Sequence, residues 1–214
     1  MSLVVFDFDG TLTRSDTTLL LGREYDVAGE MAEPAEQASP DDGSFEQTFR
    51  QRVSLLEGMP RDQVMSAFQR CKLRDDVPEL LADLRRSGMA VAVVTGSLER
   101  GIGMAFEQAD VTVDHLVANR LMLENDAVTG GVDGPLLDGT KHQALEEIAL
   151  SEGTPLEATL AVGDGIMDLP MLQTAGTAIG FKPDPVVEPH CDVVVTSIRK
   201  LRLYFEQHDI IDTD

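Results

Sequence analysis

The sequence predicts an α/β fold in which a doubly wound parallel sheet carries a small inserted helical domain. Short apolar runs, each suited to a buried strand, alternate with helical segments from Pro78 onward. One such run also opens the chain, and the stretch after it has only helical and loop patterns. We therefore expect a Rossmann-like core of residues 1–14 and 76–214, with a helical cap of residues 15–75.

The first strand, residues 3–8, is almost uniformly apolar, as is typical of a strand buried on both faces of a parallel sheet. After it the apolar residues recur at helical spacing. We expect three helices here, near residues 16–30, 44–57 and 61–71. Proline, glycine and aspartate are frequent at residues 33–43, which predicts a loop between the first two helices.

From Pro78 the pattern alternates between helix and strand. Residues 119–135 have two short apolar arms around Asn125-Asp126, which predicts a β-hairpin with its turn at that pair. The other elements expected are helices near 78–87, 98–108, 140–151, 166–173 and 198–207, and strands near 89–94, 113–118, 159–162, 177–180 and 193–195.

The chain is strongly acidic. It has 38 acidic and 17 basic side chains, a formal charge of −21, while 43% of its 214 residues are hydrophobic. The apolar content is enough for a folded core. The charge argues against binding nucleic acid, which needs a basic face, and against anionic membranes. An acidic surface with few lysines is one that molar salt would screen, so we expect a halophilic source.

Targeting and redox features are sparse. No apolar run approaches the roughly 18 residues that span a bilayer. The N-terminal segment has no basic leader, and the two cysteines, Cys71 and Cys191, are too few for a disulfide framework. We therefore expect a cytoplasmic protein without a membrane partner, and the sequence predicts no particular oligomeric state.

The first chemical motif lies at the end of the first strand. Because strand side chains alternate, Asp7 and Asp9 point the same way. Carboxyl ends of strands are where open α/β sheets place their ligands, and two adjacent carboxylates favour a cation between them. The alternative is a solvated strand end in which both aspartates only form a turn.

Two further segments suit an anion. Thr95-Gly96-Ser97 follows a strand and precedes a helix, so it offers a hydroxyl and free backbone N–H groups, unless Ser97 is simply an N-cap. Lys141 lies in the first turn of a helix, where the helix dipole disfavours a cation. An anion nearby would explain it, and a solvated surface lysine is the alternative.

The last motif is Gly163-Asp164-Gly165, with Asp168 four residues after Asp164. A strand delivers Asp164 to the same sheet edge as Asp7, and the glycines permit a tight turn. A capping aspartate among loop glycines is the alternative. Four such segments at strand ends, in this order, favour the functional interpretation.

Together these segments resemble the haloacid dehalogenase superfamily of phosphohydrolases, and most closely its phosphoserine phosphatase family. The resemblance is carried by Asp7-Phe8-Asp9-Gly10-Thr11, Thr95-Gly96, Lys141, and Gly163-Asp164-Gly165 with Asp168. It extends through nearly the whole chain, including the helical stretch 45–56, and is weakest at residues 31–43.

The resemblance implies specific roles for the acids. Asp7 would be the nucleophile that takes the phosphoryl group as an aspartyl-phosphate. Asp9 would protonate the leaving hydroxyl and then help to deprotonate the attacking water. Mg²⁺ would be held by the side chains of Asp7 and Asp164 and by the Asp9 carbonyl oxygen.

The resemblance also implies a phosphate site. Thr95, the Gly96 amide and Lys141 would bind the other phosphate oxygens and neutralise charge during the transfer. Asp168 would orient Lys141 or a metal-bound water.

The cap is expected to select the substrate. Phe45, Phe49, Arg52 and Leu56 share one face of a helix, and an arginine on an apolar face favours a planar anionic partner such as a carboxylate. The resemblance places Phe45 and Arg52 at the serine end of the pocket, with Arg52 on its carboxylate. The alternative is an ion pair between Arg52 and an acid of the cap.

Two positions depart from the family pattern. Asp16 stands where the family usually has a glutamate that contacts the substrate's amino group, and its side chain is one methylene shorter. Met167 stands where the family usually has an asparagine, and a thioether is only a weak acceptor. We expect a slower phosphatase or an altered substrate.

The resemblance therefore implies a Mg²⁺-dependent enzyme that hydrolyses a small phosphorylated metabolite, O-phospho-L-serine. Alternatives that keep the chemistry are another small phosphomonoester, or transfer of the phosphoryl group to homoserine. An alternative of another class is a non-catalytic phosphoserine-binding module, for which Asp16 and Met167 are the only support.

Overall fold

The computed structural model describes residues 2–35, 44–137 and 141–212. Within these ranges one sheet has the strand order β4-β3-β2-β1-β5-β6-β7. All neighbouring strands are parallel except β3 and β4. The strands are β1 (Leu3–Phe6), β2 (Ala90–Leu98), β3 (His115–Glu124), β4 (Ala127–Asp133), β5 (Thr159–Gly163), β6 (Thr177–Phe181) and β7 (Val193–Val195).

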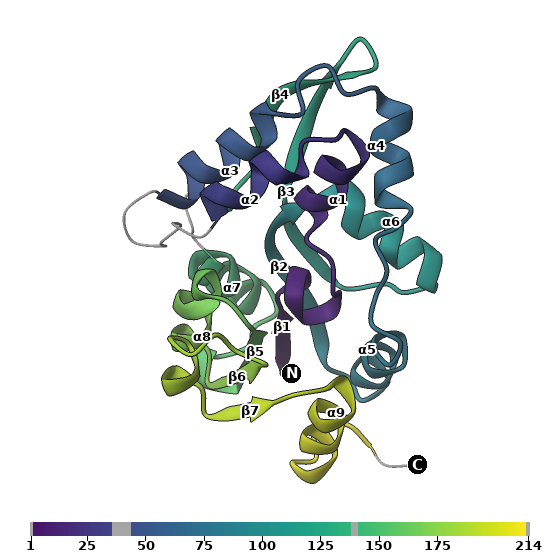
Figure 1. Cartoon of the computed structure of the whole chain (residues 1–214). Helices are drawn as coiled ribbons and strands as arrows, with labels where there is room; N and C mark the ends of the chain where they lie inside the picture. Colours follow the sequence, from purple (N-terminus) through teal and green to yellow (C-terminus); the bar gives the residue numbers. More distant parts are fainter. Residues whose placement is uncertain (1, 36–43, 138–140, 213–214) are drawn as a thin grey trace.

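Helices lie on both faces of this sheet and above its carboxyl edge (Figure 1). They are α1 (Thr17–Glu24), α2 (Ala28–Ala35), α3 (Ser44–Ser54), α4 (Arg61–Phe68), α5 (Val77–Arg86), α6 (Glu99–Ala109), α7 (Lys141–Ser151), α8 (Leu169–Thr174) and α9 (Ile198–Gln207). Buried side chains of α5, α6 and α9 pack with Val4 and Phe6, whereas those of α7 and α8 pack with Leu3 and Val5. The predicted doubly wound α/β fold is confirmed.

The register of β1 places its end beside the ends of its neighbours. Phe6 is opposite Val93 of β2 on one side and Val162 of β5 on the other. Asp7 and Asp164 follow β1 and β5 directly, so both aspartates emerge at one edge of the sheet. This edge is where an open α/β sheet places its ligand.

The helices α1–α4, here called the cap, enclose a hydrophobic cluster separate from the two sheet cores. They lie together above the carboxyl edge of the sheet (Figure 1). The single helix expected at residues 16–30 is instead two, because Asp26 adopts a left-handed φ of 61° between α1 and α2. The loop expected at 33–43 begins later, since α2 continues to Ala35, and residues 36–43 lie outside the described ranges.

The hairpin connects the sheet to the cap. β3 pairs in parallel with β2 and then antiparallel with β4, so the expected strand 113–118 and the first hairpin arm are one element. Asn125 and Asp126 form the turn, as predicted, with φ of 50° and 61°. The Gly58 N–H donates to the Val128 carbonyl at 2.8 Å, and Val128 is buried in the cap's cluster.

Other boundaries differ from expectation. The helices expected at 44–57 and 61–71 end at Ser54 and Phe68, so Leu56 lies beyond the helix that carries Phe45, Phe49 and Arg52. β2 continues to Leu98, so Thr95, Gly96 and Ser97 belong to the strand itself. The helix expected at 166–173 is a short 3-10 turn, Ile166–Asp168, followed by α8, which begins with Pro170 in its first turn.

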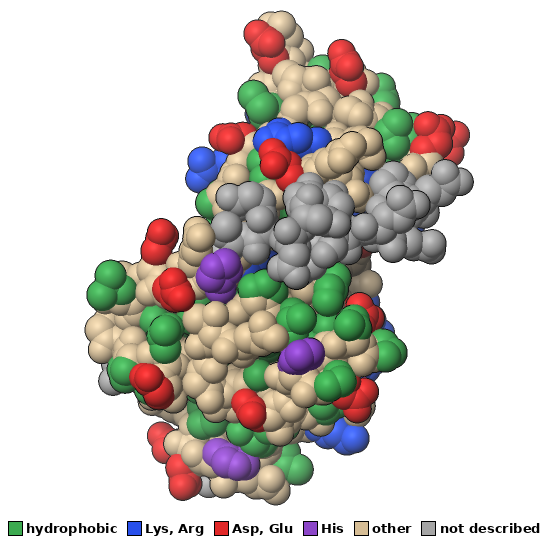
Figure 2. All heavy atoms as spheres, turned by 90° about the vertical axis from the view of Figure 1, so that its left-hand side faces the viewer, with side chains coloured by type: hydrophobic (Ala, Val, Ile, Leu, Met, Phe, Trp, Pro, Cys, Tyr) green, Lys and Arg blue, Asp and Glu red, His purple; other side chains and the backbone are tan. Residues whose placement is uncertain are grey.

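The surface matches the acidic composition. On the face shown in Figure 2, acidic side chains are distributed over both the upper and the lower part of the molecule. No helix in the described ranges is long and apolar enough to cross a membrane. Cys71 is buried and Cys191 partly buried, and both are free thiols.

Candidate active site

A pocket of about 260 Å³ lies between the cap and the carboxyl edge of the sheet. Every site residue expected from the sequence lines it. These residues are Asp7, Asp9, Asp16, Phe45, Arg52, Thr95, Gly96, Lys141, Asp164, Met167 and Asp168.

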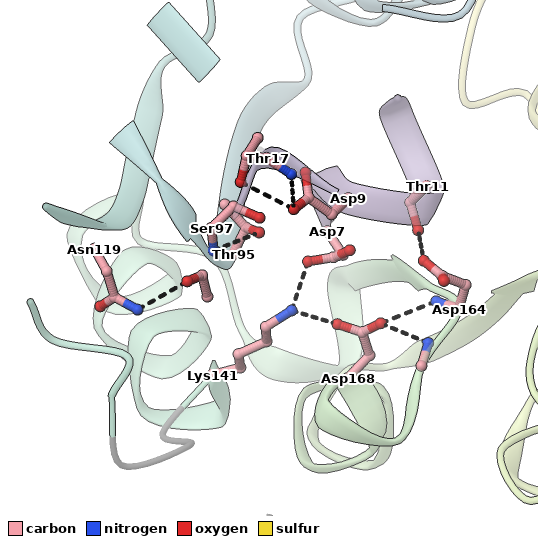
Figure 3. A network of polar contacts seen from close by, with 12 residues as sticks. Asp7, Asp9, Thr11, Thr17, Thr95, Ser97, Asn119, Lys141, Asp164 and Asp168 are labelled. Atoms are coloured by element: carbon pink, nitrogen blue, oxygen red, sulfur yellow. Dashed lines mark hydrogen bonds and ion pairs between the residues drawn. The ribbon is translucent and has the colours of Figure 1, made fainter. Parts of the chain in front are cut away.

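Lys141 is buried between two carboxylates at the floor of the pocket (Figure 3). Its Nζ lies 2.6 Å from Asp7 Oδ1 and 2.5 Å from Asp168 Oδ1. Burial alone would lower the pKa of Lys141, but the carboxylates of Asp168 and Asp7 raise it by more, so the ammonium keeps its charge. These partners explain a lysine in the first turn of α7, where the helix dipole disfavours it.

Asp168 holds the loop after β5 in place. Its Oδ2 accepts from the backbone N–H groups of Asp164 and Gly165, both at 2.9 Å, while its Oδ1 accepts from Lys141. Asp168 therefore orients Lys141 and the backbone around Asp164 at the same time.

Asp164 is held on the other side by the turn after β1. Thr11 Oγ1 donates to Asp164 Oδ1 at 2.6 Å, and Gly10, at φ 84°, lies against the same carboxylate. Burial raises the pKa of Asp164, and the charges of Asp7 and Asp168 raise it further. Burial also raises the pKa of Asp7, with Asp168 adding to this and Lys141 opposing it. The site therefore has an excess of negative charge.

Thr17 anchors Asp9 through one carboxylate oxygen. Its Oδ2 accepts from the Thr17 backbone N–H at 2.9 Å and from the Thr17 hydroxyl at 3.0 Å. Its Oδ1 is buried without a well-formed hydrogen bond to any residue described. Burial raises the pKa of Asp9 to about 7, with Asp16 adding to the rise, while hydrogen bonding to Ser97 and Thr17 opposes it.

Thr95 and Gly96 line the pocket opposite Asp168, beneath the cap. A Cβ at Gly96 would lie 2.8 Å from Phe45 Cζ, so the ring covers this glycine closely. Phe45 stacks on Phe49, with ring centroids 5.6 Å apart. The cap is therefore closed over Gly96. Ser97 does not cap α6, whose N-cap is Leu98.

Arg52 and Asp16 form an ion pair at the cap end of the pocket. Arg52 Nη2 lies 2.7 Å from Asp16 Oδ2, while Asp16 Oδ1 caps α1 by accepting from the Leu19 N–H at 2.9 Å. The alternative partner considered for Arg52, an acid of the cap, is thus present. Arg52 still lines the pocket, and its buried Nε has no partner in the described part of the chain.

Three residues near the site were not identified from the sequence. Asp184 lines the pocket, and Asn119 bonds to Gly96, which lines it. Arg74 donates from Nε to the Thr11 carbonyl at 2.8 Å and thereby supports the turn after β1. Asp184, Asn119 and Arg74 lie outside the motifs, and no spacing relative to those motifs singles them out. Thr11 and Ser97 belong to quoted motifs but were given no role of their own: Thr11 bonds to Asp164, and Ser97 lines the pocket.

The aspartates suit a metal ion. Carboxylate oxygens of Asp7, Asp164 and Asp168 lie within 4.8 Å of one another. Both oxygens of Asp168 are already engaged, so Asp7 and Asp164 are the acids with oxygens available for a cation. Oxygen donors and the excess negative charge fit a hard divalent cation.

Four aspartates thus lie at the carboxyl edge of the sheet, Asp7, Asp9, Asp164 and Asp168. The chain belongs to the haloacid dehalogenase-like hydrolases, whose family model matches residues 4–173.

Within that class, the chain belongs to the phosphoserine phosphatase family and is an enzyme of the hydrolase type. It is 40% identical over 210 residues to a phosphoserine phosphatase of Halobacterium salinarum, covering 98% of this chain and 100% of that one. It is 35% identical over 194 residues to that of Methanocaldococcus jannaschii, covering 90% and 91%.

Solved structures agree with this assignment. A phosphoserine phosphatase described as a phospho-aspartyl intermediate analogue superimposes with a TM-score of 0.87 at 33% identity, covering 95% of this chain and 98% of that one. A substrate-bound phosphoserine phosphatase superimposes with the same TM-score and identity, covering 95% and 97%.

Proposed function

We propose that this enzyme hydrolyses O-phospho-L-serine to L-serine and phosphate through an aspartyl-phosphate on Asp7. The observation that carries the proposal is the buried Asp7–Lys141–Asp168 cluster beneath a pocket whose cap end holds Arg52. The cluster suits a phosphate group, and the arginine suits a carboxylate on the same small molecule.

In the first step the Asp7 carboxylate attacks phosphorus, a bond forms between them, and the bond from phosphorus to the serine oxygen breaks. Asp9 gives its proton to that oxygen, so serine leaves as a neutral hydroxyl. In the second step water attacks phosphorus, its proton passes to Asp9, and the bond to Asp7 breaks. A pKa of about 7 for Asp9 allows it to serve as acid and then as base.

The phosphate oxygens would be bound by Thr95, the Gly96 amide and Lys141. Asp7 and Asp164, with the Asp9 carbonyl, would hold Mg²⁺. When bound, the cation neutralises phosphate charge and lowers the repulsion between these carboxylates. Asp168 keeps Lys141 directed at the phosphate through their contact.

The amino-acid end of the substrate would lie under Phe45, with its carboxylate on the free donors of Arg52. Asp16 would lie near the substrate's amino group. Met167 lines the same pocket but offers only a thioether, so we expect turnover slower than an asparagine at this position would allow.

The proposal also covers the enzyme's cellular compartment, its metal ion and its partner. We expect a cytoplasmic, Mg²⁺-dependent enzyme of a halophile that completes serine biosynthesis. Its partner would be a small phosphorylated metabolite, without nucleic acid or membrane.

The test is phosphate release from a panel of small phosphomonoesters, with Mg²⁺ and high KCl, by the wild type and Asp7→Asn. We expect O-phospho-L-serine to exceed the other esters and Asp7→Asn to abolish its hydrolysis. Preference for an ester without a carboxylate would contradict the roles of Arg52 and Asp16. Formation of phosphohomoserine when homoserine is added would indicate transfer instead of hydrolysis.

A non-catalytic binding module makes the opposite prediction. Asp16 and Met167 are the residues that favour it. Phosphoserine would then bind equally to the wild type and to Asp7→Asn, and neither protein would release phosphate from any ester.

A further inference from the structure

Asn119 lies in the middle of β3 and does not line the pocket, yet it bonds to two residues that do, Gly96 and Leu136. Its side chain is fully buried. Its Nδ2 donates to the Gly96 carbonyl at 2.9 Å, and its Oδ1 accepts from the Leu136 N–H at 3.1 Å. Figure 3 shows the amide on the far side of Lys141 from Asp168, pointing toward the end of β2.

The first of these bonds fixes the peptide between Gly96 and Ser97. The carbonyl of this peptide accepts from Asn119, and its N–H donates to Thr95 Oγ1 at 3.3 Å. Because a peptide is planar, fixing the carbonyl also fixes the N–H. Asn119 thereby sets the position of the Thr95 hydroxyl oxygen and of the strand end around Gly96.

The second bond fixes the segment at Leu136, in the wall of the pocket. Leu136 is buried and lines the pocket. Gly134, two residues earlier, has φ 149°, and a Cβ there would lie 2.4 Å from Asn119 Oδ1. The segment therefore packs directly on the amide, and only a glycine fits at that point.

We propose that Asn119 is a positioning residue that sets the spacing between Thr95-Gly96 and Leu136 in the wall of the pocket, and so shapes the site for a phosphate dianion. A primary amide suits this role, because it donates to one backbone segment and accepts from the other at once. An aliphatic side chain would leave the Gly96 carbonyl and the Leu136 N–H unpaired in a buried place. The inference rests on the proposed phosphate site of the preceding subsection.

The test compares Asn119→Asp with Asn125→Asp. Both replace an amide by a carboxylate, and these are the two asparagines of the chain. Asn125 lies in the hairpin turn at φ 50°, which aspartate tolerates. In Asn119→Asp the acceptor for Leu136 is kept, but a carboxylate oxygen faces the Gly96 carbonyl and repels it.

Two quantities are measured on folded protein in Mg²⁺ and high KCl: the calorimetric affinity for inorganic phosphate, and kcat and KM for phosphoserine. Asn119→Asp should weaken phosphate binding and lower kcat/KM by about tenfold or more. Asn125→Asp should change neither. A lower melting temperature with unchanged phosphate affinity would mean that Asn119 is merely structural and would overturn the inference.

A second variant keeps the inference testable if Asn119→Asp does not fold. Gly134→Ala displaces Asn119 without altering its chemistry and should weaken phosphate binding in the same direction. Unchanged phosphate affinity in Gly134→Ala would overturn the positioning role. A wild type that binds no phosphate at all would instead overturn the proposed phosphate site, so the two failures are distinguishable.

Discussion

Gly10 leaves the room that the Asp164 carboxylate occupies. Its φ is 84°, and a Cβ would lie 2.2 Å from Asp164 Oδ2. We predict that Gly10→Ala displaces this carboxylate and weakens Mg²⁺ binding by about 10- to 100-fold. The backbone strain should also lower the free energy of unfolding by about 1–2 kcal/mol. Calorimetric Mg²⁺ titration and urea unfolding measure the two effects.

Gly88 supplies the matched control. It has a similar φ of 77°, but a Cβ there would meet nothing within 4 Å. Gly88→Ala should therefore show the backbone strain with Mg²⁺ affinity unchanged. If the two variants bind Mg²⁺ equally well, Gly10 is needed only for the turn and not for Asp164.

Met167 is the residue expected to limit turnover. Replacing it by asparagine adds an amide able to bond phosphate or a bound water. One such bond, about 1 kcal/mol in the transition state, corresponds to a rate increase of about fivefold. We predict this gain, or a changed order of preferred esters, for Met167→Asn in the phosphate-release assay. The control is Met122→Asn, which makes the same change on the exposed hairpin and should leave the rate of phosphate release unchanged. If neither variant changes the rate or the order of preferred esters, Met167 does not limit turnover.

At the scale of elements, Asp16 connects α1 to α3. It caps α1 through Oδ1 and holds Arg52 of α3 through Oδ2. In Asp16→Asn the amide oxygen can still accept from the Leu19 N–H and cap the N-terminus of α1, but Arg52 loses its counter-charge. We therefore predict a loss of about 1 kcal/mol in the free energy of unfolding and a higher KM for phosphoserine.

Ser197→Ala is the control for this element. Ser197 caps α9, far from the pocket lining, by accepting from the Lys200 N–H. Its loss should also cost about 1 kcal/mol, measured by urea unfolding, but leave KM unchanged. A KM that rises equally in both variants would show that general destabilisation, and not the Arg52 pair, determines substrate affinity.

The elements that the sequence predicts well are those whose pattern is local. Parallel strands end at one sheet edge, so Asp7 and Asp164 could be placed together from their position after apolar runs. Likewise, the hairpin turn follows from Asn125-Asp126, two residue types that tolerate a positive φ.

The features that the sequence does not predict depend on tertiary contacts. Residues 16–30 have a continuous helical pattern, but α1 and α2 meet where a Cβ at Gly22 would lie 2.5 Å from Met31 Sδ, and the break at Asp26 makes that packing possible. The Arg52–Asp16 pair joins residues far apart in the chain. Asn119 lies within a strand, and no local pattern distinguishes a buried amide there.

The charge of −21 acts on the whole molecule. Repulsion between acidic side chains extends over about 10 Å at 0.1 M salt but only about 3 Å at 1 M. We predict that the melting temperature rises steeply with KCl and that the fold requires molar concentrations. Thermal unfolding in KCl and in NaCl at equal ionic strength measures this; full stability at about 50 mM salt would contradict a halophilic adaptation.

The central place of β1 in the sheet has a consequence for how the chain folds. Leu3 pairs with Ala90 on one side and with Thr159 on the other, so the first strand to be synthesised waits for partners from much later in the chain. Contacts of this kind close long loops and slow folding, whereas fewer residues separate α1 from α4, which also contact each other. Refolding should therefore recover the cap's helices early and turnover last, when β5 finally brings Asp164 beside Asp7.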